Sequence, residues 1–150
     1  MSTSVGSEQF AVLAVIDPAA IAASTVTSGW VFMGNWQSVT AIVKAGVLGA
    51  AATLDAKLQQ ATSSAGAGAK DIVGASIAQL TKAAADDNKQ SILNVRAGSF
   101  DINGGFNYVR LSVTVAVATS TVDVILLGVN GFTLPASNND NASVKNIKTV

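Results

Sequence analysis

Hydrophobic and polar positions alternate most regularly between residues 104 and 129. Apolar residues recur there at every second position: Val109, Leu111, Val113, Val115 and Val117. Polar residues such as Arg110 and Thr114 separate them, and this alternation is the period of a strand with one buried face. We expect Val113 and Val115 to face the interior. From Val122 to Val129 both parities are apolar, as in a strand covered on both faces. The two runs, joined by a short Thr-Ser-Thr break, predict a hairpin in a layered β protein.

Shorter apolar runs predict further strands before and between these two. Phe10–Ile16 predicts a first strand, closed by the turn-forming pair Asp17-Pro18. Val39–Val47 and Ser91–Ala97 also have the composition of strands. Residues 19–27 stay open between two structures, because their alanines favour a helix whereas the Ser-Thr-Val-Thr segment favours a strand.

The segment Thr53–Ala61 fits two periods. Its leucines and alanines alternate with polar residues, as in a strand, yet Leu54 and Leu58 also have helical spacing. We interpret it as a strand, because its neighbours are strands and because Asp55 and Lys57 then share one exposed face.

Turn signals separate these runs. Thr62–Lys70 is a loop by composition, Ala83–Lys89 is a polar turn, and Asp101–Gly105 leads into the alternating run at residue 108. About seven to nine short strands with such breaks are typical of a β-sandwich or jelly roll. The sequence therefore predicts an all-β protein with an antiparallel sandwich.

The predicted sandwich covers residues 8–131 and has a flexible arm at each end. Residues 1–7 are rich in serine and predict an extended N-terminal arm. Pro135–Val150 is mostly Asn, Ser, Asp and Lys, so residues 132–150 are predicted to form a C-terminal tail outside the core. Val144 and Ile147 are isolated apolar residues in this tail, and we expect them to anchor it to a partner.

Composition limits the chemistry open to the chain. There is no cysteine and no histidine, so a disulfide, a thiolate metal site and a histidine base are all excluded. Nine basic residues balance nine acidic ones, and only 12% of residues are charged, so we expect neither nucleic acid nor a membrane as partner. Hydrophobic residues make up 49% of the chain. This weakly charged composition favours a subunit of an assembly over a free monomer.

Neither a membrane-spanning helix nor a targeting segment is expected. The longest uncharged span, Pro18–Val43, is interrupted by serine, threonine, asparagine and glutamine residues that would be costly in hydrocarbon. Residues 1–7 carry no positive charge.

The motifs that might carry catalysis or ion binding fail on spacing. The Gly-rich loop ending at Lys70 lacks the Ser or Thr that follows the lysine in a phosphate-binding loop. Residues 86–88 and 101–104 contain oxygen ligands but not the spacing of a calcium loop, so we interpret both as turns in which side chains bond the local backbone. We expect no catalytic, cofactor-binding or metal-binding residues and no enzyme activity, with a glycosidase using two aspartates kept as a minor hypothesis.

An aromatic-rich segment between two glycines has two interpretations. Trp30, Phe32 and Trp36 can pack in the core and at the sheet edge, or they can form a platform on which a sugar stacks. The candidate partner contacts are therefore Trp30 and Trp36 in this segment, together with Val144 and Ile147 in the tail.

Much of the chain resembles a family of small structural proteins of tailed bacteriophages. The residues that carry the resemblance are Gly29–Asn35, Ala41–Gly46, Leu54–Thr62, Gly66–Lys70, Asn88–Arg96 and Gly105–Arg110. Their arrangement is similar to that of capsid cement, or head decoration, proteins with a jelly-roll fold. The Ala-rich N-terminal part and the Asn-rich tail lie outside the resemblance.

The resemblance implies a virion protein that sits on the outer surface of an icosahedral capsid. Such a protein bridges neighbouring copies of the major capsid protein. It is expected to bind the shell as a homo-oligomer (dimer or trimer) and to be present in the host cytoplasm during assembly. It has no catalytic residues to transfer and uses no cofactor. The alternative hypothesis is a β-sandwich module of a phage tail or fibre that binds a glycan on the host surface.

Overall fold

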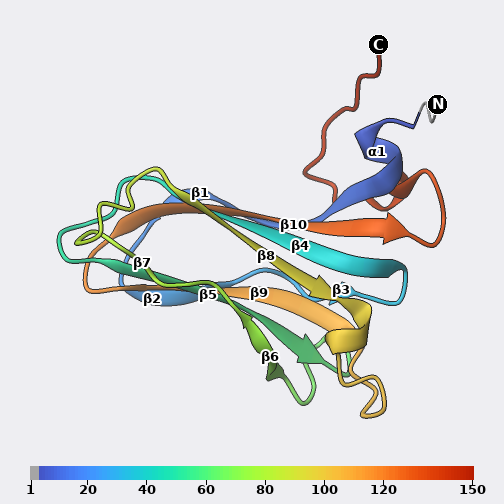
Figure 1. Ribbon diagram of the computed structural model, residues 1–150, viewed down its shortest axis with the longest axis horizontal. Coiled ribbons are helices and arrows are strands. Elements are labelled where there is room, and N and C mark those ends of the chain that lie inside the picture. The colour runs from blue at the N-terminus through green and yellow to red at the C-terminus, as the bar shows by residue number, and fades with distance from the viewer. Residues whose placement is uncertain (1–3) are drawn as a thin grey trace.

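A computed structural model describes residues 4–150, and these form ten strands in two antiparallel sheets (Figure 1). The first sheet has the order β1-β10-β4-β8, with strands Phe10–Ile21, Ser120–Gly131, Trp36–Ala45 and Gln90–Arg96. The second has the order β2-β9-β5-β6, with strands Ser24–Thr27, Tyr108–Ala116, Thr53–Ala61 and Lys70–Ser76. Two short strands extend it: β3 (Val31–Phe32) pairs with β9, and β7 (Leu80–Thr81) pairs with β5.

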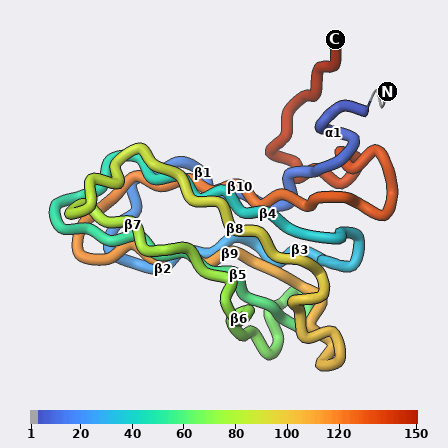
Figure 2. Tube along the Cα trace, viewed as in Figure 1, coloured from blue at the N-terminus to red at the C-terminus, as the bar shows by residue number. Residues whose placement is uncertain are grey.

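The two sheets pack face to face, and the chain crosses between them repeatedly (Figure 2). Eight longer strands are divided equally between the two sheets. Only β5 and β6 are consecutive strands that pair with one another, and this arrangement is that of a jelly roll. The predicted all-β sandwich is confirmed.

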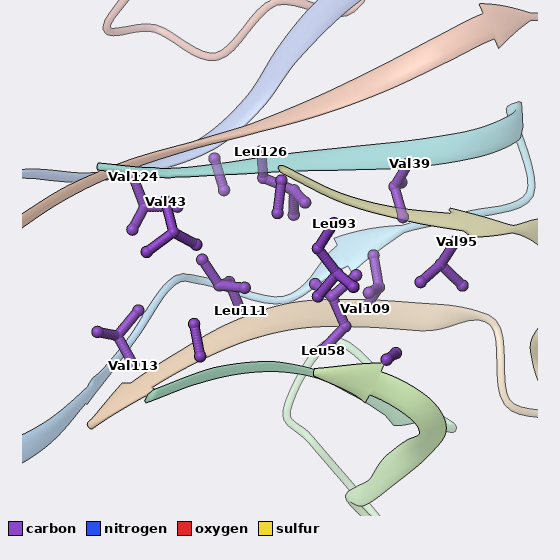
Figure 3. Close-up of a cluster of buried hydrophobic side chains, with 14 of the residues drawn as sticks. Val39, Val43, Leu58, Leu93, Val95, Val109, Leu111, Val113, Val124 and Leu126 are labelled. Atoms are coloured by element: carbon purple, nitrogen blue, oxygen red, sulfur yellow. The ribbon is translucent and has the colours of Figure 1, made fainter. Parts of the chain in front are cut away.

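The core lies between the inward faces of the two sheets. Leu126 and Val124 from the first sheet point toward Leu111, Val113 and Leu58 from the second (Figure 3). Val113 and its neighbour two residues on are fully buried, so the inward parity predicted for β9 is confirmed. Alternation of apolar and polar residues thus decides which face of each strand supplies the core.

Strand β5 confirms the choice of strand over helix for residues 53–61. Leu54 and Leu58 have no exposed surface, while Asp55 and Lys57 project from the opposite face of the sheet. Pairing with β9 on one side and with β6 and β7 on the other makes β5 a central strand, which overrides its helical propensity.

The predicted hairpin of β9 and β10 is wrong, because the two strands belong to different sheets. β9 pairs with β2, β3 and β5, whereas β10 pairs with β1 and β4. The connection leaves β9 with Val117 at a φ of 73° and then crosses the sandwich. Both strands bury one face in the same core from opposite sides, and a sequence pattern cannot distinguish this from pairing within one sheet.

The prediction that β10 is covered on both faces is also wrong. Val122, Val124 and Leu126 point into the core, but Ile125 is 37% exposed on the outer face and Leu127 is half-buried beside it. The apolar residues of the second parity therefore form an outward-facing surface.

Strand β1 continues through the predicted turn at Asp17-Pro18. Its register with β10 shifts between Ile16 and Ala19, so Asp17 and Pro18 form a bulge. The strand then continues to Ile21. Proline is tolerated there because β1 is an edge strand and its nitrogen faces no partner strand.

The chain ends are more structured than the predicted arms. Within the N-terminal arm 1–7, residues 1–3 lie outside the described part, and Gly6–Gln9 forms the helical turn α1. In the C-terminal tail, the short helix η2 (Ala136–Asn139) packs on α1 and β1, and Ala136 is fully buried. Residues 136–141 of the predicted tail therefore pack against the sandwich. No helix among residues 4–150 has the length and apolarity needed to cross a bilayer.

Candidate functional site

Every aromatic residue of the chain lies at one end of the sandwich. Five phenylalanines, two tryptophans and one tyrosine are present: Phe10, Trp30, Phe32, Trp36, Phe100, Phe106, Tyr108 and Phe132. The register joins them, since Phe10 pairs with Val129, Trp36 with Gly131, and Phe32 with Tyr108. A third helical turn, η1 (Ala97–Ser99), precedes Phe100 at this end. We call this region the aromatic end; the loops at the opposite end, residues 22–23, 46–52, 82–89 and 117–119, contain no aromatic residue.

Trp36, a predicted partner contact, is a core residue. It is 2% exposed, and its ring lies against Gly128, where a Cβ would collide with it, and close to Gly131. Its backbone N–H donates to the carbonyl of Met33 at 3.1 Å. The indole therefore closes the aromatic end of the core, and it does not reach the surface.

Trp30, the second predicted aromatic contact, is half-buried and already has a partner. The guanidinium carbon of Arg110 lies 4.5 Å from the ring centroid, a cation–π contact, and the Arg110 Nε donates to Gln59 at 3.0 Å. Gly66 adopts a φ of +81° against the indole nitrogen, so the Gly-rich loop packs on the ring edge. Trp30 and Trp36 together thus form no open stacking platform, and packing in the core and at the edge describes both.

An apolar pocket of about 200 Å³ lies at the same end. Its main lining residues are Met33, Ala97, Phe100, Ile102 and Phe106. Sequence reasoning missed this pocket, because its residues come from two connections, residues 33–34 and 97–107, that meet only in the fold. The available signal was the position of the phenylalanines, which stand just outside the strand ends.

Polar contacts fix the loop beside this pocket. Lys70 Nζ lies 2.6 Å from an Asp101 carboxylate oxygen and 3.9 Å from the centre of the Phe106 ring. The Lys70 hydrogen bond, followed by that from the Gly104 N–H, lowers the pKa of Asp101. Gln60 accepts a hydrogen bond from the Asp101 backbone N–H at 2.8 Å. The predicted turn at 101–104, with its side chain bonded to the local backbone, is confirmed.

Both chain ends leave the sandwich at the aromatic end (Figure 1). We call residues 4–10 and 132–150 the terminal corner. Phe132, Leu134 and Ile147 are each at least half exposed there, and Val144 is half-buried. The predicted tail contacts Val144 and Ile147 thus belong to the same chain end as Phe132 and Leu134, two exposed residues that the sequence analysis does not single out.

Hydrogen bonds tie the start of the tail to strand β1. Asp140 Oδ1 accepts from the Val12 backbone N–H at 2.7 Å, and the Asn141 backbone N–H donates to the Val12 carbonyl at 2.6 Å. The Asn141 side chain also donates to the carbonyl of Leu13 at 3.3 Å. The tail thus leaves from a fixed point, so the apolar residues that follow it start from a defined position.

Two adjacent acidic residues outside this corner, Asp86 and Asp87, stabilise turns. Asp86 and Asp87 each accept a backbone N–H and a lysine ammonium, from Thr81 and Lys89 and from Leu48 and Lys82 respectively. Among residues 4–150, no three carboxylates converge as they would to hold a metal ion. The arrangement at the aromatic end is suited to contact with an apolar partner.

Comparison with known proteins assigns no family: the chain matches no protein-family model, and no curated protein is significantly similar to it in sequence.

Proposed function

We propose that this chain is a structural protein of a tailed-phage virion that decorates the outside of the icosahedral capsid. In this role it bridges neighbouring copies of the major capsid protein and stabilises the shell. The observation that carries the proposal is the terminal corner, where exposed Phe132, Leu134 and Ile147 extend from a chain end held on β1 by Asp140. The resemblance to capsid cement proteins supports the same role.

The physical basis is burial of apolar side chains repeated over many copies. Each corner offers a few exposed apolar residues, which is enough for weak attachment to a groove on a shell subunit. A shell presents many equivalent sites, and an oligomeric protein that engages several of them gains avidity without a strong single contact. The zero net charge of the chain is compatible with attachment that depends little on long-range attraction.

The test is binding to particles that lack the protein. Undecorated capsids are incubated with the full chain, with a chain truncated after residue 141, and with Ile147→Asp. We expect occupancy of both variants to fall by about tenfold or more at equal concentration, because buried apolar anchors are lost. Val73→Asp is the matched control, since Val73 is 99% exposed on β6 in the opposite sheet.

Equal occupancy of the full and truncated chains would show that the tail is not the anchor. Failure of the full chain to bind any capsid would overturn the proposed role itself. Copy number per virion separates this role from the alternative of a glycan-binding tail or fibre module, which predicts a few copies at the tail instead of many on the shell. The packing of Trp30 and Trp36 gives that alternative no specific support.

A further inference from the structure

The outer face of the first sheet carries one row that is apolar on all four strands. The register aligns a row of aliphatic residues across all four strands, with Ile125 and Ile42 on the central strands and Val15 and Ile92 on the edges. Further apolar residues lie on the β1 and β10 side of this face: Val12, Leu127, Phe10 and Val129. The same two rows are completed on β4 and β8 by the polar residues Thr40, Ser38, Asn94 and Arg96. Ile92 is 65% exposed, and Phe10 and Ile125 are also exposed. An apolar sheet face of this kind, left open to water, favours a covering partner.

The rows at the two ends of this face carry charge. One end row has Asp123 on β10 beside Lys44 on β4, and the other has Phe10 on β1 and Arg96 on β8. None of the ion pairs formed among residues 4–150 includes Asp123, Lys44 or Arg96. The aliphatic row thus lies between charged groups that have no ionic partner in the described chain.

We propose that this face is a dimer interface covered by the same face of a second copy, with a two-fold axis parallel to the strands and between β10 and β4. This axis places β10 of one copy over β4 of the other, and β1 over β8. Each row of residues across the sheet then lies over the same row of the second copy. Asp123 of one copy then faces Lys44 of the other, twice, and Ile125 faces Ile42. Phe10 faces Arg96, which suits a cation–π contact. The surface is therefore complementary to itself in charge at the row of Asp123 and Lys44, and in hydrophobicity along the aliphatic row of Ile125 and Ile42, as an isologous interface requires.

The other in-plane axis, perpendicular to the strands, fits poorly. It would reverse the order of the rows and bring the Asp123 row over the row of Val129 and Ser38. A carboxylate and an ammonium would then be desolvated against groups that cannot neutralise them, which is unfavourable. Charge placement therefore selects the axis parallel to the strands.

The size of the face is sufficient for a specific, reversible dimer. Four strands ~4.8 Å apart and a span of ~23 Å along them give roughly 440 Å² of projected area per copy. With the relief of the side chains, a pair of copies covers about 1,000 Å² in total, near the lower limit for specific interfaces. Two antiparallel sheets packed in this way match the aligned packing of sheets within sandwiches.

Lateral growth of the sheet is blocked at β1, so the open face is the surface left for pairing there. Residues 140–141 occupy the edge of β1 at Val12, and Pro18 with its bulge interrupts the rest. Both features prevent a second chain from adding a strand at this edge.

The first test measures association of the isolated protein by sedimentation equilibrium from about 1 µM to about 1 mM. We expect a concentration-dependent dimer for the wild type and for Val73→Asp, and a monomer for Ile92→Asp. Ile92 and Val73 are both exposed aliphatic residues on strands, but they lie in different sheets. A wild-type monomer throughout this range, or a dimer that survives Ile92→Asp, would overturn the inference.

The second test uses charge exchange and reports on the axis. Lys44→Asp and Asp123→Lys each place like charges opposite one another in a homodimer, and each should weaken association by about tenfold or more. A mixture of the two single variants should form a heterodimer, because the carboxylates of one copy then face the ammonium groups of the other at both charged contacts. The double variant Lys44→Asp/Asp123→Lys should dimerise again. Asp55→Lys, which changes the net charge as Asp123→Lys does but lies on the outer face of the second sheet, should have no effect.

Single variants that dimerise like the wild type, or a mixture that does not associate, would contradict the proposed axis and face. These experiments contain no capsid, so their outcome is separate from that of the decoration assay. A wild-type monomer that nevertheless loses shell occupancy on Ile92→Asp would assign the face to the shell and overturn the pairing of two copies.

Discussion

The Asp140 carboxylate accepts a hydrogen bond from the backbone N–H of Val12 at 2.7 Å, across 128 positions of the chain. The next residue, Asn141, returns a hydrogen bond to the carbonyl of Val12, so both backbone groups of this edge residue have partners in the tail. Such contacts close part of an exposed sheet edge and fix where the last residues of the chain begin. The end of the polar tail is thereby coupled to the stability of the first strand.

Asp140→Ala should destabilise the protein by about 1–2 kcal/mol, because it leaves the partly buried Val12 N–H without its charged acceptor. The midpoint of urea unfolding measures this change. Asp17→Ala, on the exposed bulge of the same strand, is the control and should have little effect. An Asp140→Ala midpoint equal to that of the wild type would mean that water replaces the carboxylate at no cost.

Two truncations should separate stability from attachment. Removal of residues 142–150 should leave the melting temperature unchanged, because none of these residues is buried. Removal of residues 136–150 should lower it, since that change also deletes fully buried Ala136 and the contacts to Val12. Thermal unfolding followed by circular dichroism distinguishes the two, and similar melting temperatures would show that η2 contributes nothing to the domain.

Local alternation predicted individual strands well. The bounds of β5 and the inward parity of β9 follow from side chains that alternate across a pleated strand, and this is a property of neighbouring residues alone. Composition also identified the loops at 62–70 and 83–89, since glycine, serine and aspartate favour turns wherever they occur.

Partners in space were not predictable in the same way. The strands after Tyr108 and Ser120 follow one another closely, yet they occupy opposite sheets, and the choice depends on contacts with β1, β4 and β5. The second apolar parity of β10, with Ile125 at its centre, predicts a buried face, because an apolar face has the same sequence pattern whether the fold covers it or leaves it exposed.

For the candidate site, the sequence identified the aromatic residues but not their environments. Whether a tryptophan is buried depends on what packs on it: Trp36 lies on the glycines of β10, whereas Trp30 lies beneath Arg110. Asp140 was interpreted as tail because its partner, Val12, is at the other end of the chain.

Val113→Asp should destabilise the fold by more than about 4 kcal/mol and prevent soluble expression, because a carboxylate would be buried without a partner. Val113 has no exposed surface and faces the core of both sheets. Val73→Asp introduces the same change at a fully exposed position and should leave unfolding nearly unchanged. Expression, and chemical unfolding of any soluble fraction, measure the difference; a stable Val113→Asp protein would contradict the sandwich core.

Gly128→Ala should cost about 1–3 kcal/mol, because the added Cβ would lie 2.7 Å from Trp36 Cε3 and would force the buried ring to move. The same substitution in a Trp36→Leu background should cost much less, since the smaller side chain leaves space for the methyl group. Urea unfolding of the four proteins in this cycle gives the coupling free energy, expected to be about 1 kcal/mol or more. Additive effects would show that the two residues do not compete for the same space.

Stability should fall in acid, below about pH 4, and remain constant between about pH 5 and pH 8. Hydrogen bonds from Lys82 and from the Leu48 N–H lower the pKa of Asp87, and hydrogen bonds from the Thr81 N–H and Lys89 lower that of Asp86. A lowered pKa in the folded state means that the unfolded chain binds protons first as the pH falls. The stabilisation is therefore complete above the ordinary carboxyl pKa and is lost as the pH drops through the lowered one.

The constant stability between about pH 5 and pH 8 follows from the absence of histidine, the side chain that ordinarily titrates between those limits.

Lys82→Met removes the largest cause of the lowered Asp87 pKa, so it should reduce the slope of melting temperature against pH in the acid range. Lys145→Met removes the same charge from the exposed tail and should keep the wild-type slope. The change should be small, because the pair is partly exposed and solvent screens it. Melting curves recorded from pH 2 to pH 8 for the three proteins test this, and identical acid slopes for Lys82→Met and the wild type would exclude the Lys82–Asp87 pair as a source of acid sensitivity.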